Sequence, residues 1–141
     1  MMLRVYDDHH PREHGMAYRF TRPARWVTLN DRPHPREQTK IKNLWISACV
    51  IFGTEMKNTC PIRPPADVRL EGRIIFGTKL PNHRRDPSNW MLTTKWIWDG
   101  LVKSGLLVDD DAKHLIEVAP KFTDTIPDTD FIIQLEWTDP E

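Results

Sequence analysis

Acidic residues stand at both ends of one expected helix. Asp86 closes a basic loop, HRRDPSN, and Asp109 to Asp111 follow the helix after a short turn. Lys95 and Asp99 lie between them, four residues apart, and would share one helix face. Carboxylate oxygens are ligands that Mg²⁺ takes, and neighbouring Lys and Arg side chains neutralise phosphate. If the helix brings the two acidic stretches together, the pattern suits a divalent cation acting on a phosphodiester.

Each of these residues also has an ordinary structural explanation. Asp86 or Ser88 suits the N-terminal cap of a helix, with Pro87 in its first turn. Asp109 to Asp111 suit a solvated turn, and Lys95 suits an exposed helix position. Three neighbouring tryptophans fit core packing better than stacking on DNA bases: Trp90, Trp96 and Trp98. Only the joint pattern favours a site.

The elements that must position these residues follow from the spacing of apolar side chains. A spacing of three and four predicts helices over residues 36–52 and 90–104, and Gly53 and Gly105 are placed to end them. Strands are expected over residues 24–29, 67–77, 114–118 and 131–137. We therefore predict one α+β domain over residues 21–141, with a mixed sheet packed against two main helices. Residues 1–20 are expected to be a partly disordered N-terminal extension.

The overall charge of the 141-residue chain is zero, with 20 basic and 20 acidic residues. This balance argues against a basic DNA-coating protein and against an acidic tail protein. The distribution is uneven: residues 19–42 carry seven basic against two acidic residues, and residues 106–141 carry two against ten. Such a chain can join a polyanion-binding surface to a carboxylate cluster, although scattered solvated charge is the simpler explanation.

Other sequence features restrict the location of the protein. No apolar stretch approaches the roughly 20 residues of a membrane span, and the N-terminus does not resemble a secretory signal. Cys49 and Cys60 show no metal or redox spacing, which indicates free thiols in a reducing compartment, and we expect a cytoplasmic protein. His9, His10 and His14 lack an acidic or cysteine ligand that would complete a metal site.

The segment from residue 83 to residue 111 resembles the RusA family of Holliday junction resolvases, which is common in phages and prophages. Arg85, Asp86 and Asn89 match the arginine-aspartate-x-aspartate-asparagine loop of that family. Lys95 and Asp99 match its helix pair in the context KxxxDGL, and the glycine and aspartate pair of the family follow at residues 105, 109 and 110. The likeness extends over residues 24–137, with specific motifs in a small part of them.

This resemblance implies a homodimer that depends on Mg²⁺ or Mn²⁺ and makes paired nicks in four-way DNA junctions of the bacterial host cell. By position, Asp86, Asp109 and Asp110 would bind the metal, and Lys95 would lie near the scissile phosphate. The DNA-contacting residues would be Arg84, Arg85, Asn89, Arg32, Arg36 and Lys40, with Ser88, Asp99 and Asp111 supporting the site.

Three departures from the family pattern affect this interpretation. Ser88 stands in place of the second loop aspartate and removes one negative charge. Three extra residues separate Asn89 from Lys95, and Asp111 adds an acid that could replace the missing one. Three hypotheses therefore stay open: a junction-resolving endonuclease, a catalytically weak or inactive junction-binding protein, and an α+β interaction protein whose acidic motif is coincidental.

Overall fold

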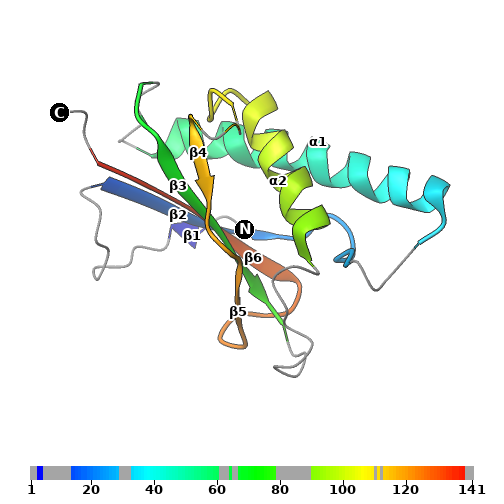
Figure 1. Ribbon diagram of the computed structural model, residues 1–141. Coiled ribbons are helices and arrows are strands. Elements are labelled where there is room, and N and C mark those ends of the chain that lie inside the picture. The colour runs from blue at the N-terminus through cyan, green and yellow to red at the C-terminus, as the bar shows by residue number, and fades with distance from the viewer. Residues whose placement is uncertain are drawn as a thin grey trace.

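The computed structural model describes residues 3–4, 14–28, 33–60, 64, 67–78, 90–109, 111 and 113–138. It contains two helices and six strands in this part of the chain (Figure 1). In chain order they are β1 (Leu3–Arg4), β2 (His14–Thr21), α1 (Pro35–Thr59), β3 (Leu70–Gly77), α2 (Met91–Lys103), β4 (Leu115–Glu117), β5 (Lys121–Thr123) and β6 (Asp130–Trp137).

All of these strands form one mixed sheet. Its order is β1-β2-β6-β3-β4, and β5 pairs with β3 beyond the end of β4. The central strand β6 runs antiparallel to both β2 and β3, whereas β4 and β5 run parallel to β3. The prediction of a single α+β domain with a mixed sheet and two main helices is therefore confirmed.

Side chains alternate across the sheet, and the helices cover one of its faces (Figure 1). On β6, Phe131, Ile133 and Leu135 belong to the buried core cluster that includes residues of both helices. Gln134 and Glu136 alternate with them and therefore point to the opposite face of the sheet. This alternation explains why the sequence of residues 131–137 reads as a strand, and that prediction is confirmed.

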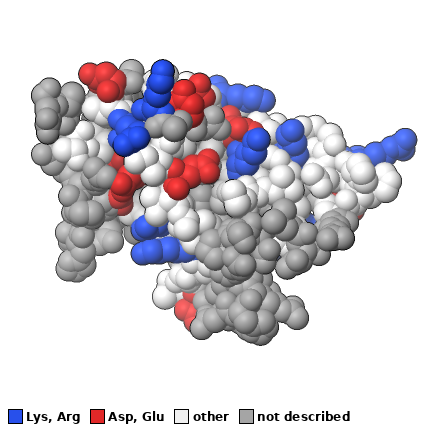
Figure 2. Space-filling model, viewed as in Figure 1, with Lys and Arg blue, Asp and Glu red and all other residues white. Residues whose placement is uncertain are grey.

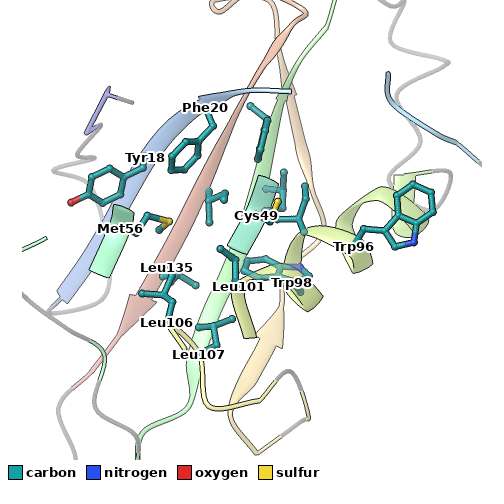
Figure 3. Close-up of a cluster of buried hydrophobic side chains, with 14 of the residues drawn as sticks. Tyr18, Phe20, Cys49, Met56, Trp96, Trp98, Leu101, Leu106, Leu107 and Leu135 are labelled. Atoms are coloured by element: carbon teal, nitrogen blue, oxygen red, sulfur yellow. The ribbon is translucent and has the colours of Figure 1, made fainter. Parts of the chain in front are cut away.

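The two helices approach each other closely where each carries a glycine. A Cβ atom on Gly53 would overlap the side chain of Ser104, and one on Gly100 would lie 2.8 Å from the carbonyl oxygen of Ile46. Figure 3 shows Cys49 of α1 and Leu101 of α2 in the layer between the helices and the sheet. The close approach fixes α2, which carries the candidate site, against α1.

Two sequence predictions are wrong for the same reason, namely that packing overrides a local signal. Gly53 does not end the first helix, because α1 continues to Thr59 and uses the glycine for contact with α2. Residues 24–28 do not form a strand, since the side-chain hydroxyl of Thr93 binds both the amide and the carbonyl of Val27 (3.1 and 2.8 Å). Instead, this segment carries Trp26 into an aromatic cluster with Trp45.

The N-terminal boundary also differs from the prediction. β2 pairs with β6 along its whole length, and Met16, Tyr18 and Phe20 are buried in the core. Residues 14–20 thus belong to the domain rather than to an extension, and β1 adds two further residues to the sheet. The eight-residue register with β6 gives this segment a partner that a single sequence does not reveal.

The other helix and strand predictions near the site are confirmed within a few residues, except for the cap: the N-cap residue of α2 is Trp90, which makes no side-chain cap hydrogen bond, rather than Asp86 or Ser88. α2 spans Met91–Lys103, and Gly105 ends the helix with a φ of 83°. The strands predicted over residues 67–77 and 114–118 correspond to β3 and β4. The three tryptophans of this region are buried as core residues, with exposed fractions of 1–2%: Trp90, Trp96 and Trp98.

Both cysteines are buried free thiols, as predicted. Burial raises the pKa of the Cys49 thiol far above its usual value, so this residue behaves as a small apolar side chain. Within the described segments, no helix is both long enough and apolar enough to cross a lipid bilayer.

Candidate metal and phosphate site

The helix α2 connects two parallel strands, and this connection determines where its two ends lie. Trp90, at the start of the helix, packs against Phe76 near the end of β3, with ring centroids 4.7 Å apart. Beyond the other end of α2, Asp109 lines a small cavity together with Leu70, the first residue of β3. The two ends of α2 therefore lie near opposite ends of β3.

This arrangement bears on the expectation that one helix brings the two acidic stretches together. Thirteen helical residues at about 1.5 Å each separate the described ends by about 20 Å. Asp109 lies at one end, and Trp90, four residues after Asp86 in sequence, lies at the other. Asp86 and Asp110 lie outside the described residues, so the convergence of the three carboxylates stays a prediction.

The turn that presents Asp109 is held from both sides. On the helix side, the Lys57 ammonium donates to the Ser104 carbonyl oxygen (2.6 Å), which places a positive charge at the C-terminus of α2. Leu106 and Leu107 then enter the core, with exposed fractions of 7% and 3%. Asp109 is exposed and follows Leu107 by two residues, so its position depends on buried anchors close to it in the chain.

On the strand side, Asp111 organises the entry into β4. Its carbonyl oxygen accepts hydrogen bonds from the amides of His114 (3.0 Å) and Leu115 (2.9 Å). Its carboxylate also lies 2.5 Å from His114 Nδ1, and this hydrogen bond holds the pKa of Asp111 below its usual value. The carboxylate of Asp111 is thus occupied by a local contact with His114.

The helix pair Lys95 and Asp99 lies on the outer side of α2. Lys95 is exposed and Asp99 is half-buried, and no ion pair joins these two described side chains. Figure 3 shows that Trp98 points toward the sheet, whereas Trp96 lies on the other side of the helix. The exposed ammonium of Lys95 is therefore available to an anion that approaches α2 from solvent.

The first turns of α1 carry two of the basic residues that were predicted to contact DNA. Arg36 and Lys40 are exposed there, and His34 caps the helix by accepting from the Arg36 amide (3.1 Å). Glu37 in the first turn pairs with Arg25 at 2.8 Å. On the face shown in Figure 2, basic side chains project alone at the right-hand end, where α1 begins in Figure 1, and elsewhere mix with acidic ones.

The structure thus describes part of the predicted site. It places six of the predicted residues: Lys95 and Asp99 on α2, Arg36 and Lys40 on α1, and Asp109 and Asp111 in the segment between α2 and β4. No three acidic, histidine or cysteine residues of the described part gather into a metal-binding group. The other predicted site residues lie outside the described residues: Arg32, Arg84, Arg85, Asp86, Ser88, Asn89 and Asp110.

Sequence reasoning missed a cavity of about 330 Å³ beside α2. Met91, Thr94 and Trp98 line it from the helix, and Val118 and Pro120 line it from the segment between β4 and β5. The two groups of lining residues are 20 or more positions apart along the chain, so only the tertiary structure brings them together. The helix that lines one side of this cavity, α2, also carries Lys95.

No family model matches this chain, and no curated protein matches it either. The resemblance of residues 83–111 to the RusA family therefore depends on the motif residues themselves. A functional assignment therefore depends on those residues and on the geometry of α2.

Proposed function

We propose that this protein is a divalent-metal-dependent endonuclease that resolves four-way DNA junctions and acts as a cytoplasmic homodimer. The observation that carries the proposal is the order of Asp86, Lys95, Asp99 and the pair Asp109–Asp110 along one stretch of chain. These residues match the RusA-like pattern in type and order. The exposure of Lys95 and Asp109 is consistent with a site that must admit DNA.

The donor set suits Mg²⁺ or Mn²⁺ in its chemistry. In this proposal Asp86, Asp109 and Asp110 bind the cation through carboxylate oxygens, which hard divalent cations prefer. The exposed carboxylate of Asp109, held by the buried leucines before it, fits this role. The cation would supply the charge that stabilises phosphate oxygens and acidifies the attacking water. Lys95 then neutralises the negative charge that develops on the phosphate.

The DNA backbone would be bound by the remaining predicted residues. The guanidinium groups of Arg84 and Arg85 suit bidentate contact with phosphate oxygens, and Asn89 suits a single hydrogen bond. Arg36, exposed in the first turn of α1, extends the positive surface. Binding through such contacts weakens as salt concentration rises. Arg32 completes the proposed set of phosphate contacts.

Cleavage of a synthetic four-way junction tests the proposal directly. We expect paired nicks that require Mg²⁺ or Mn²⁺, and a loss of at least about 100-fold in rate for Asp110→Asn. Asp124→Asn, which changes an exposed acid outside the motif, is the matched control and should cleave at the wild-type rate. Absence of cut product at every concentration of either cation would refute the nuclease.

A mixing experiment asks which subunit supplies each acid. Because α2 separates its ends by about 20 Å, Asp86 must reach Asp109 through its own loop or come from the second subunit. Asp86→Asn and Asp109→Asn are each expected to be inactive as homodimers. Nicking after the two variants are mixed and re-equilibrated would place the acids of one site on two subunits. Continued inactivity of the mixture would place them on one.

Ser88 favours a second candidate, a junction-binding protein with weak or no catalysis. Replacing an aspartate by serine removes one charged metal ligand from the family pattern. This candidate predicts salt-sensitive junction binding without nicking, and Ser88→Asp would then increase cleavage. If the wild type already cleaves as fast as Ser88→Asp, the second candidate fails. A protein that does not bind branched DNA at moderate salt would instead be an interaction protein with a coincidental motif.

A further inference from the structure

The outward face of α1 carries two large apolar side chains in solvent. Leu44 is 53% exposed and Ile51 is 58% exposed, although both are in the middle of a 25-residue helix. They are seven residues apart, which is two helical turns, so they lie on the same face. The opposite face of α1 is fully used by the core, through buried residues Ile41, Trp45, Cys49, Gly53 and Met56.

Charged residues flank this apolar pair in a specific order. Lys40 precedes Leu44 by one turn, and Glu55 follows Ile51 by one turn, and both charged side chains are exposed. Ser47 lies between the two apolar residues and is also exposed. We refer to Lys40, Leu44, Ser47, Ile51 and Glu55 as the α1 stripe. Its order is basic, apolar, small, apolar and acidic.

We propose that the α1 stripe is a self-association surface that binds the α1 stripe of a second copy of this chain in the antiparallel direction. A two-fold axis between Ser47 and Ala48 would place Leu44 beside the partner's Ile51. The same axis would bring Lys40 within reach of the partner's Glu55. Each contact then occurs twice, as two-fold symmetry requires. Ser47 and the half-buried Ala48 at the axis are small enough for helices to approach within about 8–10 Å.

The charges decide in favour of this partner and this direction. A parallel pair of helices would place Lys40 beside the partner's Lys40 and Glu55 beside the partner's Glu55, and like charges repel. A DNA-binding face would be uniformly basic, whereas this stripe ends in an acid and is apolar in its centre. The antiparallel arrangement is the one that places each Lys40 beside the partner's Glu55, which carries the opposite charge.

This inference extends the proposed homodimer by naming its contact surface. It also assigns Lys40 to a protein contact, whereas the sequence pattern suggested a DNA contact. One helix pair buries less area than a standard interface, so we expect a dimer with a dissociation constant of the order of micromolar. The test is made on the full chain without DNA: a dimer that does not use the α1 stripe overturns this inference alone, whereas a monomeric wild type also contradicts the proposed homodimer.

Sedimentation equilibrium over a range of protein concentrations measures the dimer. Leu44→Glu should raise the dissociation constant at least roughly tenfold, because it buries a charge at the centre of the contact. Lys40→Glu and Glu55→Lys should each weaken the dimer, and the double exchange Lys40→Glu/Glu55→Lys should restore it. Lys42→Glu makes the same charge change on another side of α1 and should have no effect. Circular dichroism verifies that each variant is folded.

The possible results of these measurements either support or refute the antiparallel pairing of the α1 stripe. Weakening by the single variants with recovery in the double exchange supports the antiparallel stripe. A wild-type chain that stays monomeric at the highest concentration overturns the inference, as does a dimer unaffected by Leu44→Glu. Weakening by the single variants without recovery in the double exchange refutes the antiparallel pairing.

Discussion

Replacing Gly100 by alanine tests the close approach of α1 and α2, on which the position of the candidate site depends. In an ordinary helix this change is favourable by about 1 kcal/mol, because glycine has the greater backbone freedom to lose. Here the new Cβ would lie 2.8 Å from the carbonyl oxygen of Ile46 and closer still to Cys49 Cβ. Neither atom can rotate away, since one is backbone and the other is fixed to it.

The expected loss follows from these opposing effects. Overpacking in a rigid interior costs about 1–3 kcal/mol, and the upper value applies where backbone must move. Subtracting the gain of about 1 kcal/mol in helix propensity leaves a net loss of about 2 kcal/mol in the free energy of unfolding. For a chain of 141 residues this corresponds to a fall of about 6 °C in Tm.

Urea unfolding monitored by the fluorescence of the six tryptophans measures the change. Lys103→Ala, at an exposed position of the same helix, is the control and should stay within about 0.5 kcal/mol of the wild type. A Gly100→Ala variant as stable as the wild type, or more stable, would show that the helices do not pack at this distance.

Three further predictions concern single residues. Burial alone would raise the pKa of Asp130, but hydrogen bonds led by Arg19 outweigh it and lower the pKa. The ionised group therefore stabilises the fold above the unfolded pKa near 4, and this contribution is lost as pH falls through the lower folded value. Asp130→Asn should cost about 1 kcal/mol at pH 7 and progressively less as pH falls below about 4, as urea unfolding over a series of pH values will measure; a loss that does not change with pH would contradict this. Gly105→Ala should lower stability by about 1 kcal/mol in thermal unfolding, since its φ of 83° disfavours a side chain, and an unchanged Tm would argue against that backbone conformation. His114→Ala should raise the pKa of Asp111 toward its usual value in an NMR titration, because it removes the hydrogen bond that lowers it; no change would disprove the contact.

The spacing of apolar side chains was enough to predict the helices and strands whose boundaries do not depend on contacts with distant segments. Both helices and the strands β3, β4 and β6 were predicted because their apolar side chains repeat at the period of the element. Gly105 was predicted to end the second helix because glycine readily takes the positive φ of a C-terminal cap, and the structure shows that φ at 83°. The candidate residues themselves were chosen by type, order and spacing, which are properties of the chain alone.

Tertiary structure decided the features that depend on contacts between distant segments. α1 continues past Gly53 because this glycine packs closely against α2, and residues 24–28 are irregular because Thr93 takes both hydrogen bonds of Val27. β2 joined the domain because β6 offers an eight-residue register. The direction of the β3–α2–β4 connection likewise places the ends of α2 near opposite ends of β3, which spacing along the chain does not encode. The sequence alone therefore determined which chemical groups are present and most of the helices and strands of the domain. Long-range packing decided which of those groups face solvent, the core or each other, because burial and hydrogen bonding depend on neighbours far away in the chain.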